Sequence, residues 1–276
     1  MFLMKKVDLS ISLVTYKSKR DVLDETVQSV LNSEGISFRL YIIDNSPTDE
    51  IRSWYNDERI VYIFNNKNVG FGAAHNIIMG DSEKLGRYHL VLNPDIKFTA
   101  DVLKGLQDYM DEHDDVGDII PKVYYTNGKV APICKLLPTP FDLLLRMFVP
   151  VRSWRLKTAK NYLMSFCDYN HIINAPYLSG CFMFIRAGIL DEIGLFDEQM
   201  FMYAEDIDLS RRIHRKYKTI FYPTLTIWHH SANESHSNLR LMMIHIKSCL
   251  YYFNKWGWFF DKERKLINER AVQENS

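Results

Sequence analysis

The sequence has few cysteines and no long apolar run. Its four cysteines, at positions 134, 167, 181 and 249, are scattered without Cys-x-x-Cys spacing. This argues against a disulfide framework or a zinc ribbon and favours a reducing compartment such as the cytosol. No run reaches transmembrane length, and the apolar start, Met1 to Met4, is too short for a signal peptide. We therefore expect a cytoplasmic protein that at most lies on the inner face of the plasma membrane.

The chain also lacks net charge. Lys+Arg and Asp+Glu both total 34, so charge gives no support for nucleic-acid binding, and we expect none. We find no internal repeat and no low-complexity linker. With 276 residues, 47% of them hydrophobic, the chain is long enough for a large core. The simplest interpretation is one α/β domain with additional segments outside its regular strands and helices.

Several motifs of nucleotide-binding and hydrolytic proteins are missing too. There is no Walker A sequence, no N-terminal glycine-rich loop of the nucleotidyltransferase type, and no nucleophile elbow. The histidines at positions 229, 230 and 236 do not form HExxH, and no carboxylate or cysteine completes a zinc site with them at a familiar spacing. The segment Gly70-Phe71-Gly72-Ala73-Ala74-His75 imitates the dinucleotide fingerprint, but His75 occupies the position of the third glycine. An NAD site is therefore disfavoured.

What is present in the first half is an alternation of strands and helices. Apolar runs predict the strands, and apolar residues three or four positions apart predict the helices. The predicted order is strand 8–14, helix 21–32, strand 38–43, strand 60–64, a helix ending at Met79, strand 88–92, and a helix with Thr99 as its N-cap that runs to about Glu112. This order indicates a parallel sheet covered on both faces. Such sheets bind ligands at the carboxyl ends of their strands, where Asp44, Asn68 and Asp95 could all line one crevice.

The second half is less regular. Strands are predicted at 116–125, 177–186, 219–222 and 225–228, with a hairpin turn at Asn127-Gly128, Gly180 inside strand 177–186, and Pro223 between the last two strands. Two stretches, 143–160 and 251–265, join apolar or aromatic residues to basic ones. Such stretches suit an interface with anionic lipid. They equally suit packing on the protein core or a dimer contact.

The densest cluster of charge is Glu205-Asp206-Ile207-Asp208, which aromatic residues precede and an arginine pair follows. Adjacent like charges raise the pKa of at least one carboxyl group. On a helix that starts near Ala204, the first turn tolerates negative charge, and Asp208 can pair with Arg211 or Arg212. Taken alone, the segment fits an acidic helix start with salt bridges as well as it fits a catalytic site.

Six separated segments together point to one family. They are Val14-Thr15-Tyr16, Asp44-Asn45-Ser46, Asn68 to Asn76, Asn93-Pro94-Asp95, Ser179 to Met183, and Phe201 to Leu209. Their order and spacing resemble glycosyltransferase family 2, the inverting GT-A enzymes, and in particular its rhamnosyltransferase-like bacterial branch. The resemblance spans about residues 8–256. It implies an α/β GT-A fold, in which a Rossmann-like, mostly parallel nucleotide-binding sheet is continuous with an acceptor-binding half.

The resemblance also implies how the chain is divided. Residues 1–276 would form a single glycosyltransferase domain. Its nucleotide-sugar-binding half would reach about residue 115, its acceptor and catalytic half would cover 116–236, and a helical, aromatic and basic extension would cover 237–276.

The family's binding roles transfer position by position. The residues implied to bind the nucleotide sugar are Thr15, Tyr16, Asp44, Asn68, Asn76, Asn93, Asp95 and Gly180. Asn93 replaces the first carboxylate of the family's Asp-x-Asp motif, which leaves Asp95 to bind a divalent metal, Mg²⁺ or Mn²⁺. His229 resembles the histidine that completes the metal site in some relatives. His230 is the alternative ligand, and a neutral structural role for His229 is another alternative.

The resemblance assigns the chemistry to the acidic segment. Asp206 matches the general base that takes the proton from the acceptor hydroxyl, Glu205 positions the acceptor, and the metal neutralises the leaving diphosphate. The implied reaction transfers a sugar, with inversion, to a hydroxyl of a surface polysaccharide (capsule or O-antigen) or of a lipid-linked oligosaccharide. The donor would be dTDP-rhamnose, UDP-galactose, UDP-glucose or another nucleotide sugar. The resemblance of the segment 245–253 to the rhamnosyltransferase-like branch favours a deoxysugar.

Two other classes of function are left open. A non-catalytic saccharide-binding module on the same frame would not need Asp95 and Asp206, and both are present. A nucleotidyltransferase is disfavoured by the missing glycine-rich loop. Besides a donor and an acceptor, the sequence allows peripheral membrane contact and a homodimer.

Overall fold

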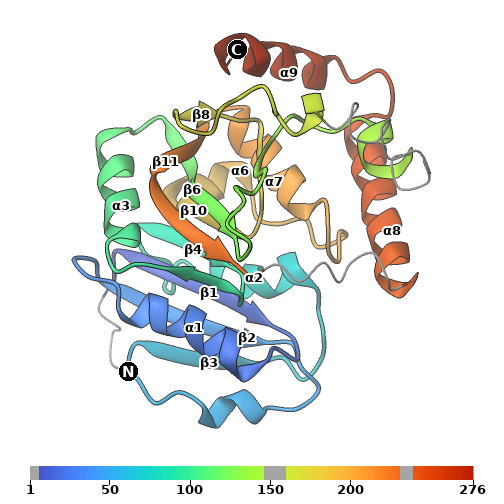
Figure 1. The fold of residues 1–276 in the computed structure, drawn as a ribbon. Coiled ribbons are helices and arrows are strands. Elements are labelled where there is room, and N and C mark those ends of the chain that lie inside the picture. Colours follow the sequence, from blue (N-terminus) through green and yellow to red (C-terminus); the bar gives the residue numbers. More distant parts are fainter. Residues whose placement is uncertain (1–5, 146–159, 231–238, 276) are drawn as a thin grey trace.

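The structure, a computed structural model, describes residues 6–145, 160–230 and 239–275. The strands of its central sheet are β1 (Leu9–Thr15), β2 (Phe38–Asp44), β3 (Ile60–Phe64), β4 (Tyr88–Leu92), β5 (Ile96–Phe98), β6 (Val116–Tyr125), β8 (Ile173–Asn174), β10 (Phe182–Arg186) and β11 (Lys218–His229). They pair in the order β3-β2-β1-β4-β10-β6-β11-β5, and β8 pairs with β11 off this path (Figure 1). A separate two-stranded sheet joins β7 (Cys134–Lys135) to β9 (Tyr177–Leu178).

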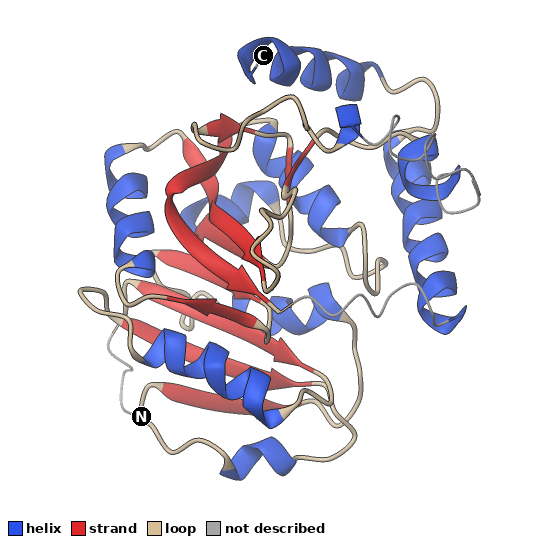
Figure 2. Ribbon diagram, in the orientation of Figure 1, coloured by secondary structure: helices blue, strands red, loops and turns tan. Residues whose placement is uncertain are grey.

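Helices cover both faces of this sheet (Figure 2). They are α1 (Arg20–Leu31), α2 (Phe71–Met79), α3 (Val102–Glu112), α6 (Leu190–Ile193), α7 (Glu205–His214), α8 (Leu239–Trp256) and α9 (Lys262–Asn275), with shorter helical turns η1 (Glu50–Ser53), η2 (Phe141–Leu145) and η3 (Ala187–Ile189). Alternation along β2 shows how the faces are divided. Ile42 belongs to the same core cluster as the buried residues of α1 and α3, whereas Tyr41 and Ile43 pack with Ala74 and Ile78 of α2. The predicted parallel sheet with two covered faces is therefore confirmed for the first half of the chain.

Strands β3, β2, β1 and β4 run parallel to one another. Their registers set Thr15 opposite Asp44, and Asp44 opposite Phe64. The strands therefore end level with each other, and the loops that follow them meet at one edge of the sheet. This edge is where the sequence places its polar segments, and it is where parallel α/β sheets bind ligands.

The second half of the sheet includes reversed strands. Strand β10 lies antiparallel to β4 and pairs Phe182 with Leu92, so the residues before β10 lie beside those after β4. The Asn93 N–H accordingly donates a 3.0 Å hydrogen bond to the Cys181 carbonyl. Strand β5 lies antiparallel to the end of β11, with Ile96 opposite His229. Segments 93–96, 180–182 and 227–229 thus meet at the same edge of the sheet.

Three element predictions are wrong in detail. The predicted strand 177–186 is two strands, β9 and β10, because the chain turns away at Gly180 to contact Asp206. The predicted strands 219–222 and 225–228 form one strand, β11, which absorbs Pro223 through a register shift between Tyr222 and Thr226. Thr99 is not the N-cap of α3, since Asp101 occupies that position, and β5 was not predicted at all.

The C-terminal helices pack on the start of α7. Cys249, Tyr252 and Phe253 of α8 join Ala204 and Ile207 in a separate core cluster. The helix that follows, α9, is amphipathic only weakly and buries little more than Arg264 and Ala271. Within residues 237–276, the chain is helical at 239–256 and 262–275. In the described parts of the chain, no helix is long and apolar enough to cross a membrane.

Candidate active site

A strained turn introduces the acidic segment. Tyr203 and Ala204 both have positive φ, 69° and 67°, a conformation that costs a non-glycine residue about 1–2 kcal/mol. The loop after β3 holds this turn in place, because the Phe71 N–H donates a 2.9 Å hydrogen bond to the Phe201 carbonyl. A Cβ on Gly70, whose φ is 96°, would lie 2.5 Å from that carbonyl oxygen. The approach therefore requires glycine at position 70.

Three hydrogen bonds fix the carboxylate of Asp206 at the start of α7. The Tyr177 hydroxyl donates to Oδ2 at 2.8 Å, and the Gly180 N–H donates to the same oxygen at 3.0 Å. The Ile207 N–H donates to Oδ1 at 2.9 Å. A Cβ at position 180 would lie 2.7 Å from the Asp206 Cβ, so Gly180 leaves room for this carboxylate. Charged acceptors bound by several donors are held firmly in place.

Glu205 faces a different environment from its neighbour. Its side chain is buried, only 4% exposed, and Oε2 has no hydrogen-bond partner. Burial raises the pKa of Glu205 well above its usual range, and the adjacent Asp206 carboxylate acts in the same direction. The crowding of like charges therefore adds to the effect of burial at this carboxyl group.

Asp208 forms the predicted salt bridge, with Arg212. Its Oδ2 accepts hydrogen bonds from Arg212, and its Oδ1 accepts from the Trp256 indole N–H at 2.7 Å and the Lys255 ammonium at 2.8 Å. Arg211, the alternative partner, instead pairs with Asp261 at 2.7 Å, because α8 and α9 bring Asp261 over α7. The fully buried Asp208 side chain therefore fastens α7 to α8.

The predicted metal ligands lie side by side. The antiparallel pairing of β5 with β11 brings His229 Nε2 to 3.2 Å from Asp95 Oδ1. The two atoms are close, yet Asp95 Oδ1 is buried and has no aligned hydrogen bond. The alternative ligand, His230, directs its ring to Glu25 on α1, at 3.1 Å. Of the two histidines, His229 is therefore the one placed to share a cation with Asp95.

The residues present fit a partial metal site. A carboxylate oxygen without an aligned hydrogen bond and a neighbouring imidazole are both suitable ligands for a divalent ion. Within residues 6–145, 160–230 and 239–275, no three His, Cys, Asp or Glu side chains gather closely enough to hold a metal ion. Asp95 and His229 would therefore need further ligands from beyond the described residues, such as phosphate oxygens of a nucleotide.

The residues predicted to hold the base and ribose lie at the ends of β1 and β2. Asp44 is fully buried and accepts hydrogen bonds from the Tyr62 hydroxyl at 2.7 Å and the Ser46 N–H at 2.8 Å. Thr15 is also buried and donates to the Ser18 hydroxyl at 2.7 Å. Tyr16, by contrast, is 49% exposed. Tyr16 is therefore the member of this group whose ring is accessible to a ligand.

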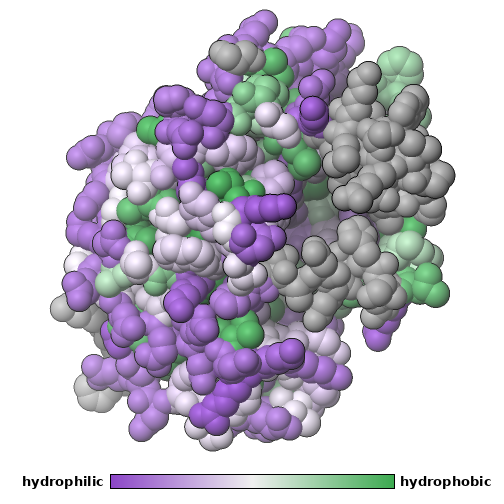
Figure 3. Space-filling model, in the orientation of Figure 1, coloured by the Kyte–Doolittle hydropathy of each residue, from purple (hydrophilic) through white to green (hydrophobic). Residues whose placement is uncertain are grey.

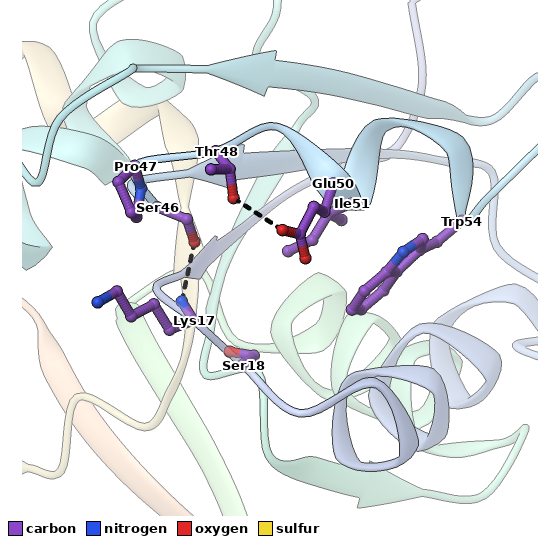
Figure 4. Close-up of a pocket in the computed structure, with 8 residues that line it drawn as sticks. All are labelled: Lys17, Ser18, Ser46, Pro47, Thr48, Glu50, Ile51 and Trp54. Carbon is purple, nitrogen blue, oxygen red and sulfur yellow. Dashed lines mark hydrogen bonds between the residues drawn. The ribbon is translucent and has the colours of Figure 1, made fainter.

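A pocket of about 320 Å³ adjoins these strand ends (Figure 4). Its lining residues are Lys17, Ser18, Ser46, Pro47, Thr48, Glu50, Ile51 and Trp54. The Lys17 N–H donates a 2.8 Å hydrogen bond to the Ser46 hydroxyl, which joins the loops after β1 and β2 across the pocket wall. No sequence pattern predicted this pocket, although the Ser46-Pro47-Thr48 turn directly follows Asp44.

Two asparagines predicted at the donor site bind protein groups. The Asn68 side-chain oxygen accepts a 3.0 Å hydrogen bond from the Gly70 N–H and so shapes the loop. The Asn76 amide bonds to both backbone groups of Phe196, donating at 2.9 Å and accepting at 3.1 Å. Both side chains thus brace the segments that surround the site. A direct contact of either with the nucleotide stays a prediction.

His75, which breaks the dinucleotide fingerprint, belongs to a buried polar network. Its Nδ1 lies 2.6 Å from the Ser12 hydroxyl oxygen, which lies 2.9 Å from His89 Nε2. Burial lowers the pKa of His75 well below its usual range and that of His89 to about 3, so both rings are held neutral. The network satisfies polar side chains of buried β1 and supports the sheet rather than a ligand.

The comparisons with known proteins agree with this geometry. Residues 10–194 match the family described as glycosyl transferase family 2. The chain belongs to this family. The matched range contains every predicted donor-site residue and ends before Asp206.

Two curated relatives show which members of the family this family 2 glycosyltransferase resembles. It is 28% identical over 216 residues to the low-salt glycan biosynthesis hexosyltransferase Agl10 of Haloferax volcanii, covering 76% of this chain and 62% of that protein. It is 24% identical over 184 residues to the N-acetylglucosaminyl-diphospho-decaprenol L-rhamnosyltransferase of Mycobacterium tuberculosis, covering 61% and 58%. The chain thus spans about 60% of the length of these curated relatives.

Solved structures identify the fold. The structure of GalNAc-T7 with UDP, GalNAc and Mn²⁺ matches with a TM-score of 0.60 at 17% identity, covering 84% of this chain and 45% of that one. The family 2 glycosyltransferase accordingly has the predicted GT-A fold.

Proposed function

We propose that this family 2 glycosyltransferase transfers a sugar, with inversion, from a nucleotide diphosphate to an acceptor hydroxyl. The observation that carries the proposal is the pair of carboxylates joined by residues 180 and 181. The Gly180 N–H binds Asp206, and the Cys181 carbonyl binds the Asn93 N–H, two residues before Asp95. Residues 180 and 181 therefore fix the position of Asp206, the proposed base on α7, relative to Asp95, the proposed metal-binding carboxylate after β4. We propose the matching division of the chain, with donor residues up to about 115 and acceptor residues beyond.

The proposed mechanism is a single displacement. The acceptor oxygen attacks the anomeric carbon, the bond from that carbon to the phosphate oxygen breaks, and Asp206 takes the acceptor's proton. The donors on Asp206 orient its carboxylate, and the buried Glu205 beside it positions the acceptor. A divalent cation, Mg²⁺ or Mn²⁺, held by Asp95 and His229, would neutralise the leaving diphosphate. Attack from the face opposite the leaving group inverts the anomeric centre.

The donor can be identified by thermal stabilisation. We expect one nucleotide sugar, from a panel that includes dTDP-rhamnose, UDP-galactose and UDP-glucose, to raise the unfolding temperature in the presence of manganese. A ligand at one hundred times its Kd adds about 2.7 kcal/mol, or about 5–10 °C for a domain of this size. The matching nucleoside monophosphate is the control. Equal stabilisation by every compound, or by none, would contradict the proposed donor site.

We also propose a lipid-linked acceptor and peripheral contact with an anionic membrane. The predicted stretch 251–265 carries four Lys or Arg residues against two Asp or Glu residues, a net charge of +2 in a chain of net charge zero. Phe259 and Phe260, between α8 and α9, are 75% and 97% exposed. Hydrophobic side chains also reach the surface at the right-hand edge of Figure 3, where Figure 1 places α8. Exposed aromatic residues beside basic ones suit the interface of an anionic bilayer.

Flotation with liposomes tests the membrane contact. We expect the protein to float with vesicles containing anionic lipid at low salt, and to float less as salt screens the charges. Replacing Phe259 and Phe260 with serine should reduce the bound fraction severalfold, because each phenyl ring contributes apolar burial. The matched control is Phe166→Ser, an exposed aromatic outside this segment. Protein that stays in the soluble fraction at low salt would contradict the proposed membrane contact. The remaining proposal for this surface would then be a homodimer contact. Of the other predicted stretch, 143–160, residues 146–159 lie outside the described residues.

A further inference from the structure

A strained backbone conformation places Tyr203 directly before the acidic segment. Tyr203 and Ala204 are consecutive residues with φ of 69° and 67°. Glycine, and less often asparagine or aspartate, tolerates this left-handed conformation, whereas tyrosine rarely adopts it. Such strain persists only where the surrounding contacts impose it, and it is concentrated at sites that bind ligands. The mechanism above gives Tyr203 no role, so the strain points to a role that the mechanism does not include.

Hydrogen bonds from two helices hold this turn. The Ser248 hydroxyl of α8 donates to the Met202 carbonyl at 2.9 Å. The Asp208 N–H of α7 donates to the Ala204 carbonyl at 3.0 Å. Together with the hydrogen bond from the loop after β3, these contacts fix the backbone on both sides of Tyr203. The fold therefore sets the direction in which the Tyr203 side chain leaves the backbone.

The Tyr203 ring lies against α8 and near Glu205. Its centre is 4.6 Å from the centre of the His245 ring, at an interplanar angle of 36°. Burial raises the pKa of the Tyr203 hydroxyl, and the Glu205 carboxyl group acts in the same direction. Electrostatic effects of this kind fall off with distance, so the two side chains are near neighbours. Tyr203 is half-buried, so part of it stays accessible close to the acidic segment.

Tyr203 and Glu205 together offer two kinds of contact to a ligand. The Glu205 side chain is 4% exposed, and within the described residues its Oε2 has no hydrogen-bond partner. A ligand hydroxyl group that reaches this oxygen would satisfy it. The face of an aromatic ring carries partial negative charge and attracts C–H groups, whose hydrogens carry partial positive charge. A sugar ring matches both contacts, because it has hydroxyl groups around its edge and C–H groups on its faces.

We propose that the Tyr203 ring stacks on the acceptor sugar, the one whose hydroxyl group Asp206 deprotonates. The inference rests on the proposed function, in which Glu205 and Asp206, the two carboxyl groups that follow Tyr203, serve the acceptor. An apolar lipid chain could contact the ring, but it would leave the buried Glu205 oxygen without a partner. The enzyme therefore recognises its acceptor through an apolar sugar face as well as through hydroxyl groups.

Methyl glycosides test this inference separately from the proposed function. The protein is first saturated with manganese and the nucleoside diphosphate that stabilises it most. Methyl glycosides of glucose, galactose, rhamnose and N-acetylglucosamine, with farnesol as an apolar probe, are then titrated by saturation-transfer NMR. Tyr203→Phe keeps the ring, whereas Tyr203→Leu and Tyr203→Asn remove it, and asparagine tolerates the left-handed backbone. The matched control is Tyr109→Leu, because the Tyr109 ring also packs on a histidine, His113, at 4.1 Å between ring centres.

We expect at least one methyl glycoside to bind, with magnetisation reaching the C–H groups of one sugar face. Tyr203→Leu and Tyr203→Asn should weaken this binding about fivefold or more, the scale of a lost aromatic contact. Tyr203→Phe and Tyr109→Leu should stay within about twofold of the original protein, because both keep the ring at position 203.

Three results would overturn the inference at the glycoside site: equal binding by the original protein and both ringless variants, binding of no glycoside, or binding of farnesol alone. A selective loss of nucleotide-sugar affinity in the ringless variants would also overturn it, because Tyr203 would then contact the sugar of the donor. A protein that binds no nucleotide would instead refute the proposed function.

Discussion

Asp206→Asn is expected to lower turnover by about a hundredfold or more, the usual scale for the loss of a general base. Asparagine keeps the shape of the side chain and can still accept hydrogen bonds from Tyr177 and Gly180, but it cannot take the acceptor's proton. Donor affinity should change little, because the base acts on the acceptor. Initial rates at saturating donor, together with the nucleotide Kd, check both statements.

Two neighbouring carboxyls provide matched controls for this substitution. Asp208→Asn should lower the free energy of unfolding by about 3 kcal/mol, the scale for breaking a buried ion pair, with a milder loss of rate. Its side chain is fully buried and bonds to Arg212, Trp256 and Lys255. Glu205→Gln should lose less rate than Asp206→Asn, because burial already disfavours the charged form of the Glu205 carboxyl group. Near-normal turnover of Asp206→Asn with the true acceptor would show that the base lies elsewhere.

Asp95→Ala should abolish the dependence of nucleotide binding on manganese while leaving the fold intact. In the original protein, manganese should tighten nucleoside diphosphate binding about tenfold or more relative to EDTA, because the diphosphate otherwise approaches a carboxylate of like charge. In Asp95→Ala, the two Kd values should become equal. Calorimetric titration with and without EDTA measures both.

The neighbouring histidines separate a metal site from a general electrostatic effect. His229→Ala should weaken the manganese effect, since its Nε2 lies 3.2 Å from Asp95. His230→Ala should preserve it, because that ring binds Glu25 instead. Equal nucleotide affinity in manganese and EDTA for the original protein would count against a metal site here.

Predictions that depend on local pattern succeeded, and those that depend on distant pairing did not. Continuous apolar runs predicted the bounds of both β3 and β4, although β4 is buried throughout and β3, at the edge of the sheet, is only half-buried. The pairing of Asp208 with Arg212 follows from helix spacing alone. In contrast, β5 has only three residues and is defined by its pairing with β11, so the local sequence does not predict a strand there.

The predictions for the candidate site divide in the same way between local pattern and distant pairing. Asp95 and His229 were predicted from motifs, but their contact depends on how β5 pairs with β11. Tyr177, whose hydroxyl binds Asp206, was missed, because it lies on a two-residue strand that leaves no periodic signal. Arg211 could not be separated from Arg212 by spacing, since its partner Asp261 lies on a later segment.

The hydrogen bond between Phe71 and Phe201 has a consequence for enzyme engineering. Chimeras that exchange the proposed acceptor half of one relative for that of another would cut the chain between these residues. The parental contact combines a glycine that cannot be replaced at position 70 with a left-handed turn at 203 and 204. A hybrid that takes residues 70–71 from one parent and 201–204 from the other would mismatch the two loops. Crossovers should therefore inherit both loops from the same parent.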